Sequence, residues 1–146
     1  MPYFCIKFQV ARILAIDYGL KRTGIAVTDP LKLIASGLTT VPTDELLAFL
    51  EGYVKKEEVE RIVVGAPKRM NNVVSEVEGP ISKFLLALGK RLPDIPVSRQ
   101  DERFTSKMAA QSMLEGGMKK KKRRNKAMLD EISATLILQS YLSKNR

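Results

Sequence analysis

The sequence contains no histidine and only one cysteine, Cys5. The absence of histidine excludes a Ser-His-Asp triad, a Cys-His pair and any zinc site with histidine ligands. One cysteine cannot form an internal disulfide or a thiolate zinc site, and so little cysteine fits a cytoplasmic protein. The chemistry left to an enzyme is a hard metal ion held by carboxylates, lysine chemistry or a bound cofactor.

Long apolar runs are also missing. No stretch approaches the ~20 apolar residues of a membrane span. The N-terminal stretch MPYFCIKFQVAR lacks the basic start and long apolar middle of a signal peptide. We therefore expect a cytoplasmic protein with no membrane partner. The chain has 146 residues, of which 45% are hydrophobic, and this length fits one domain.

Acidic residues are absent from one strongly basic segment near the C-terminus. Its seven basic residues supply most of the formal net charge of +9 and leave only +2 for the rest of the chain. They are Lys119, Lys120, Lys121, Lys122, Arg123, Arg124 and Lys126. Such a run indicates a polyanionic partner, either nucleic acid or an anionic membrane surface. A solvated, mobile loop is the alternative explanation.

Hydrophobic patterns predict three strands, a helix, and then alternating strands and helices. The expected strands are 12–17, 23–28, 36–41, 61–67 and 95–100; the expected helices are 44–56, one that either kinks or starts near Pro80, one from Thr105 or Ser106 to about Gly116, and 126–143. Residues 4–10 form an edge strand or a loose extension. We expect Thr43 to cap the first helix. In the last helix, the candidates for burial include Leu129, Ile132, Leu136 and Tyr141. This order predicts an α/β fold with a mixed sheet between helices.

Several acids fall where such a fold builds its sites. Asp17 ends the first strand, Asp101 and Glu102 end the fifth, and Asp130 lies near the start of the last helix. Two carboxylates ~4 Å apart repel by about 4 kcal/mol at an effective dielectric near 20, so a cluster of three requires a cation. One or two Mg²⁺ or Mn²⁺ ions would meet this need, with Asp17 bridging two ions, Glu102 binding one and Asp130 the other.

Simpler roles are open for each acid. Asp17 is as well explained as a turn former, and Asp101 as a helix cap or as an ion-pair partner of Arg103 or Lys107. Asp130 is followed by Glu131, and one of these two is expected at the surface.

Four motifs stand in order along the chain: DYGLKRTGIA from Asp17, VGAP ending at Pro67, DERFTS from Asp101, and KAMLDEISATLILQSYL from Lys126. Together they resemble the YqgF/RuvX family of small bacterial RNase H-like proteins, over about residues 12–143. The family is described as Holliday junction resolvases, or as nucleases that process the 5′ end of 16S rRNA precursors. Two features depart from its pattern: Asn72 replaces a usual glycine, and residues 1–11 extend beyond the usual start.

The resemblance implies an RNase H-like fold over residues 12–146: a five-stranded mixed sheet, its first three strands antiparallel, with helices on both faces. Residues 1–11 remain an unassigned extension. The resemblance also implies a nuclease site in which Asp17, Glu102 and Asp130 bind divalent metal ions, with Asp101 as the rival of Glu102. The function we expect is processing of precursor 16S rRNA. Junction resolution in DNA and a non-catalytic nucleic-acid-binding module are the alternatives.

The basic residues near these motifs then become candidate phosphate contacts. Given the motif, we expect Lys21 and Arg22 to bind phosphate beside the metal site. Arg103 either binds phosphate or neutralises the acids around it. Lys126 holds the scissile phosphate, tunes Asp130, or forms a simple i,i+4 pair with it. The segment 119–126 is expected to follow a nucleic-acid backbone, and the protein to act as a monomer or a homodimer.

Overall fold

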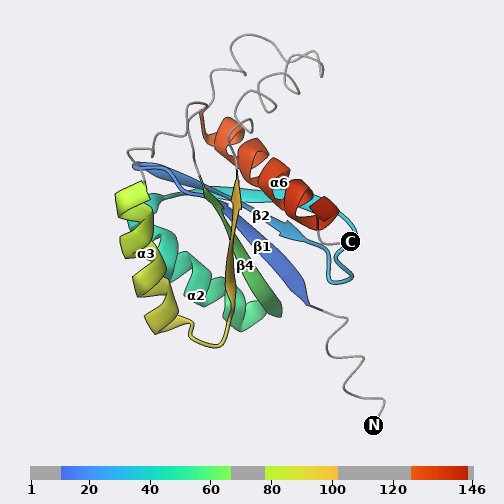
Figure 1. Ribbon diagram of the computed structural model, residues 1–146, viewed down its shortest axis with the longest axis horizontal. Helices are drawn as coiled ribbons and strands as arrows, with labels where there is room; N and C mark the ends of the chain where they lie inside the picture. Colours follow the sequence, from blue (N-terminus) through green and yellow to red (C-terminus); the bar gives the residue numbers. More distant parts are fainter. Residues whose placement is uncertain (1–10, 67–77, 102–125, 145–146) are drawn as a thin grey trace.

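The computed structural model describes residues 11–66, 78–101 and 126–144, which form one five-stranded sheet between helices (Figure 1). The strands are β1 (Arg12–Asp17), β2 (Arg22–Thr28), β3 (Ala35–Pro42), β4 (Val59–Ala66) and β5 (Val97–Asp101). Their order across the sheet is β3-β2-β1-β4-β5. All five strands lie within a few residues of the predicted positions.

Strand direction brings several strand ends to one edge of the sheet. β1 pairs antiparallel with β2, and β2 pairs antiparallel with β3, whereas β1, β4 and β5 are mutually parallel. The prediction of a mixed sheet with three antiparallel strands first is confirmed. β1, β4 and β5 therefore end together, at Asp17, Ala66 and Asp101. We call this side of the sheet the carboxyl edge. The last residue of β3, Pro42, pairs with Arg22 and lies at the same edge.

Helices cover both faces, as predicted. The 3-10 helix η1 (Thr43–Glu45) leads into α2 (Leu46–Lys56), and α3 (Glu78–Arg91) packs beside α2 on one face. α6 (Lys126–Lys144) covers the other face and begins at the carboxyl edge (Figure 1). α3 is described from Glu78 and carries Pro80 in its first turn; residues 67–77, through which a longer helix kinked at Pro80 would run, lie outside the described residues.

Strand alternation divides the core between the two faces. Leu14 and Ile16 of β1 pack with α2 and α3, whereas Ile13 and Ala15 pack with α6. This follows from the pleat of a strand, in which successive side chains point to opposite faces. β1 is apolar at every one of these positions because it is buried from both sides.

The buried stripe of α6 differs from the predicted one. The buried residues are Ser133, Ala134, Ile137, Leu138 and Leu142, whereas Ile132, Leu136 and Tyr141 are only half-buried. The side chain of Leu129 lies outside the described residues. The segment from Ile132 to Leu138 is apolar or small nearly all round, so its hydrophobic pattern marks no single face. The small residues Ser133 and Ala134 face the sheet because they allow the helix to approach it closely.

Two expected elements cannot be compared with the structure. Residues 4–10 and the helix expected from Thr105 or Ser106 lie outside the described residues. Within the parts that the structure describes, no helix is long and apolar enough to span a membrane.

Candidate functional site at the carboxyl edge

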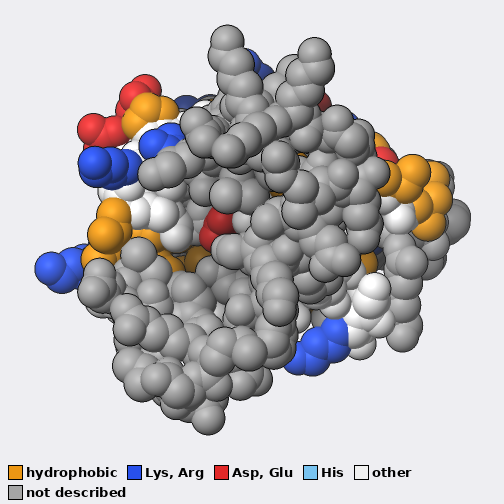
Figure 2. Space-filling model, turned by 90° about the horizontal axis from the view of Figure 1, so that it is seen from above, with side chains coloured by type: hydrophobic (Ala, Val, Ile, Leu, Met, Phe, Trp, Pro, Cys, Tyr) orange, Lys and Arg blue, Asp and Glu red, His pale blue; other side chains and the backbone are white. Residues whose placement is uncertain are grey.

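The carboxyl edge brings together the strand and helix ends that carry the candidate acids. Asp17 closes β1 and pairs with Gly24 of β2. Asp101 closes β5 and pairs with Ala66, and α6 begins close by with Asp130 in its second turn (Figure 1). Figure 2 looks onto this edge: some acidic side-chain atoms are visible near the middle of the view, and both acidic and basic side chains lie toward its margins.

Register and periodicity indicate which side of the sheet each position occupies. Asp17 follows Ile13 and Ala15 at intervals of two residues, so it has the strand position that faces α6. Asp130 lies three residues before Ser133 and four before Ala134, the buried positions by which α6 contacts the sheet. The strand position of Asp17 and the helix that carries Asp130 therefore belong to the same side of the sheet.

Only part of the predicted three-acid site can be compared with the structure. Glu102 and the side chains of Asp101 and Asp130 lie outside them. Among the residues that the structure describes, no three acidic or cysteine side chains lie close enough together to hold a metal ion. The three-acid metal site therefore stays a prediction at the level of side chains.

The turn after Asp17 is held by Thr43, and we call this contact the Thr43 latch. Its hydroxyl donates to the carbonyl oxygen of Gly19 at 2.6 Å, and its N–H donates to the carbonyl of Lys21 at 3.0 Å. Since that hydroxyl proton is engaged, the fully buried Thr23 must donate its own to Thr43 across 3.0 Å. The predicted helix cap is therefore wrong: η1 and α2 have no side-chain cap, because the threonine hydroxyl reaches the β1–β2 turn instead.

Gly19 is required by the tightness of that turn. A Cβ at this position would collide with the carbonyl oxygen of Arg22, a backbone atom that cannot move aside independently. The motif glycine thus keeps the chain beside Asp17 compact.

The predicted phosphate contacts are only partly within the described residues. Lys21 is exposed in the β1–β2 turn, and Arg22 is half-buried at the start of β2, so both flank Asp17 along the chain. Arg103, the segment 119–124 and the side chain of Lys126 lie outside the described residues.

Arg99 forms a set of contacts near the carboxyl edge that we call the arginine clamp, and the sequence did not predict it. Arg99 of β5 bonds Glu78, the first residue of α3, through Nη1 to Oε1 at 3.0 Å and Nη2 to Oε2 at 3.3 Å. Its Nη2 also donates to the carbonyl of Gly65 at 3.0 Å, and its Nε to that of Val64 at 3.3 Å. The clamp fixes the start of α3 to the ends of β4 and β5. A lone arginine in an expected strand was the only signal for it.

Glu131 also has a defined place. Its carboxylate lies against Gly37 of β3, where an added Cβ would come within 2.8 Å of Oε1. Glu131 therefore leans toward β3, on the flank of α6.

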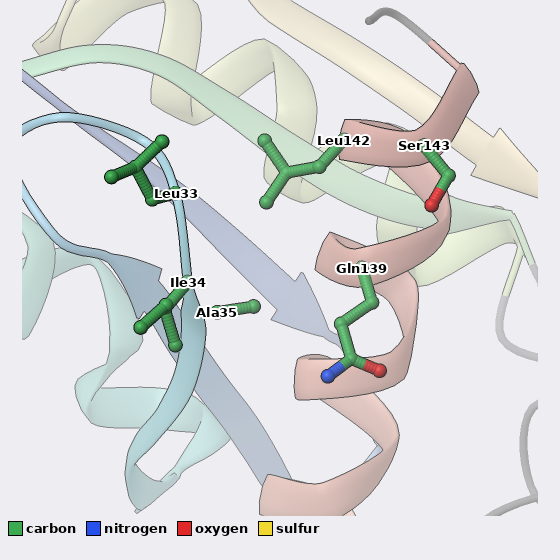
Figure 3. Close-up of a pocket in the computed structure, with 6 residues that line it drawn as sticks. All are labelled: Leu33, Ile34, Ala35, Gln139, Leu142 and Ser143. Carbon is green, nitrogen blue, oxygen red and sulfur yellow. The ribbon is translucent and has the colours of Figure 1, made fainter.

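A hollow at the opposite end of the sheet is chemically different. It has a volume of about 410 Å³ and lies between the start of β3 and the last turns of α6, from which Leu142 and Gln139 reach toward it (Figure 3). No charged side chain belongs to the described residues that line it: Leu33, Ile34, Ala35, Gln139, Leu142 and Ser143. Among the described residues, its only polar side-chain groups are the amide of Gln139 and the hydroxyl of Ser143, so it lacks the carboxylates and basic groups found near the carboxyl edge.

Residues 11–144 match the family described as RuvX, Holliday junction resolvase. A protein of Christiangramia forsetii named "Putative pre-16S rRNA nuclease" is 64% identical over 91% of this chain and 98% of its own length. One of the same name from Bacteroides fragilis is 63% identical over 94% of this chain and 99% of its own. The structure of Thermus thermophilus RuvC in complex with Holliday junction substrate matches with a TM-score of 0.54 at 18% identity, covering 92% of this chain and 96% of that one. That likeness shows an RNase H-like fold.

Proposed function

The chain belongs to the RuvX family of Holliday junction resolvases, and from this premise we propose that it is a divalent-metal-dependent nuclease that processes the 5′ end of precursor 16S rRNA. The support for rRNA is the name carried by relatives that are more than 60% identical over nearly their whole length. The observation that supports a reaction at the carboxyl edge is that β1 ends there with Asp17 and that α6, the helix that carries Asp130, begins there.

The residues at this edge fit Mg²⁺ or Mn²⁺. Asp17 supplies a carboxylate at a strand end whose backbone is held by pairing with Gly24, and carboxylate oxygens are the ligands these ions prefer. In our proposal Asp17, Glu102 and Asp130 hold the metal, with two ions as the expected number. A bound metal would make hydroxide available near neutral pH, so the lack of histidine is no obstacle. The protein's part is to hold the acids and the substrate phosphate in place.

Strand alternation favours Glu102 over Asp101 as the second ligand. Arg99 of β5 bonds Glu78 on the α3 side, whereas Ser98 accepts a hydrogen bond from Arg61 at 2.6 Å on the α6 side. Position 101 lies two residues after Arg99, so strand alternation assigns it to the α3 side as well. If alternation continues by one residue, Glu102 shares the α6 side with Asp17. Asp101 remains the rival in this proposal.

Nucleic acid is the partner that we propose, and its phosphates would meet basic residues around the acids. Lys21 and Arg22 beside Asp17 are the nearest candidates along the chain, followed by Arg103 and the segment 119–126. Should all seven charges of that segment contact single-stranded phosphates, log K would fall with log salt with a slope of about −5. We propose a cytoplasmic monomer or homodimer; a homodimer would suit the alternative substrate, a four-way DNA junction.

The test is cleavage by the purified chain and its Asp17→Asn variant. Each is incubated with Mg²⁺ or Mn²⁺ on a precursor 16S rRNA fragment, a four-way DNA junction and plain single strands. We expect metal-dependent cleavage of the rRNA precursor and a loss of at least about 100-fold in Asp17→Asn, since even outer-shell partners of metal sites cost 10–100-fold. Asp94→Asn removes an exposed acid beyond α3 and serves as the matched control.

Three results would change the proposal. Preferred cleavage of the junction would favour the resolvase alternative. Nucleic-acid binding without cleavage in any metal would favour the binding module. Cleavage unaffected by both Asp17→Asn and Glu102→Gln would point to a contaminating nuclease and would leave the proposed site without support.

A further inference from the structure

A second pocket opens at the carboxyl edge, on the face of the sheet opposite to that of position 17. It has a volume of about 430 Å³ and lies between the beginnings of α2 and α3. The residues that line it are Tyr18, Thr43, Asp44, Leu47, Pro80, Lys83 and Phe84. The metal site proposed above uses none of them.

Tyr18 connects this pocket to the candidate acids. It directly follows Asp17 and packs against the core formed with α2 and α3, its ring centroid 5.4 Å from that of Phe84. Because successive strand residues point to opposite faces, Asp17 and Tyr18 lie back to back at the end of β1. The Thr43 latch fixes the turn that follows and also forms part of the pocket wall. A strand of nucleic acid crossing the edge would meet both residues.

We propose that this pocket binds the base of an unpaired nucleotide next to the phosphate that is cleaved. The inference rests on the proposed nuclease function and defines its substrate class as single-stranded or frayed nucleic acid. Tyr18 offers an aromatic surface, and Leu47 and Pro80 offer apolar walls, which suit the flat face of any base. A base inside a duplex is stacked and paired and cannot enter without being extruded.

The charged residues of the pocket fit the same ligand. Lys83 is exposed on α3 and lines the pocket, so its ammonium group is available to the phosphate that accompanies the base. Asp44, also exposed, can accept a hydrogen bond from the amino or imino groups of a base edge. A purely apolar ligand would leave both of these charges without a role.

Binding is tested in metal-free buffer with chains that carry Asp17→Asn, so that binding is separated from cleavage. The probes are single-stranded RNA oligonucleotides with 2-aminopurine at successive positions, and a matched RNA duplex. We expect quenching of 2-aminopurine at one position on binding. Tyr18→Leu should abolish the quenching and weaken single-strand affinity about tenfold, while duplex affinity stays the same, because stacking on one aromatic residue is worth ~1–3 kcal/mol. Tyr18→Phe should retain both properties.

Tyr53→Leu is the matched control, since Tyr53 also belongs to an aromatic pair in the same core, 6.0 Å from Phe49, but lies outside this pocket. Lys83→Met gives a second, independent reading at an exposed site. It should reduce the slope of log K against log salt by about 0.7, whereas Lys90→Met, exposed further along α3, should not.

Unchanged single-strand affinity in Tyr18→Leu, equal losses in Tyr18→Leu and Tyr53→Leu, or quenching at no position would each overturn the base pocket. These outcomes do not depend on cleavage. If Asp17→Asn and Glu102→Gln still cleave while Tyr18→Leu loses single-strand binding, the metal site is left without support and the base pocket stands. The reverse pattern refutes the pocket alone.

Discussion

Replacing Thr43 by valine removes the Thr43 latch with almost no change in side-chain volume. The variant loses the hydroxyl that donates to the carbonyl of Gly19 at 2.6 Å and accepts from Thr23 at 3.0 Å. The backbone bond from the N–H of residue 43 to Lys21 is retained. The substitution therefore tests the two side-chain bonds that hold the turn after Asp17.

The expected cost follows from these two bonds. An ordinary hydrogen bond contributes about 0.5–1.5 kcal/mol net, and a buried polar group left without a partner costs about 1–3 kcal/mol. Thr23 is fully buried, so the loss of its acceptor falls in the second class. We expect the free energy of unfolding to drop by about 2–3 kcal/mol. For a chain of this size, the melting temperature should fall by about 4–12 °C.

Urea unfolding at neutral pH measures the change directly. Thr43→Ser, which keeps the hydroxyl, should recover most of the stability. Thr39→Val is the matched control, because Thr39 is half-buried on the same strand that leads to Thr43 and should tolerate valine within about 0.5 kcal/mol. A loss below about 0.5 kcal/mol in Thr43→Val, or an equal loss in Thr39→Val, would refute the latch.

Other parts of the fold give further predictions. Arg99→Met should destabilise the protein by about 1–2 kcal/mol in urea unfolding, because it leaves the half-buried Glu78 carboxylate and two strand carbonyls without their donor; an unchanged midpoint would contradict the clamp. Leu138→Ala should cost about 2–5 kcal/mol by the same measurement, since this side chain is fully buried between α6 and the sheet, and a cost under 1 kcal/mol would contradict that packing. In the β2–β3 loop, backbone N–H donors, first that of Ile34, lower the pKa of Asp29 below its ordinary 3.8. The stabilisation is therefore present above pH 3.8 and is lost as the pH falls through the lower folded-state pKa. Asp29→Asn should show a weaker loss of stability in acid than the parent chain, and identical acid-unfolding curves would argue against this contribution.

Local patterns predicted the elements better than the contacts of individual side chains. The apolar run ending at Asp17 predicted both ends of β1 correctly, because a strand buried on both faces needs apolar side chains at every position. Thr43 carried a real helix-start signal, yet its hydroxyl found a partner 24 residues away in the chain. The sequence also could not predict which residues of α6 are buried. Small and apolar residues surround this helix, and only its packing against the sheet selects a buried face.

The sequence by itself determined the order of strands and helices, the family resemblance and the positions of the acids at element ends. These are local properties, set by side-chain periodicity and by the backbone needs of residues such as Gly19. Only the tertiary structure decided that β1, β4 and β5 end at one edge and that α6 starts there. It also decided that α6 covers the face to which the alternation of β1 assigns Asp17, while Tyr18 lines a pocket on the other face. Strand pairing and helix packing join residues far apart in the chain, and no local pattern specifies which of them meet.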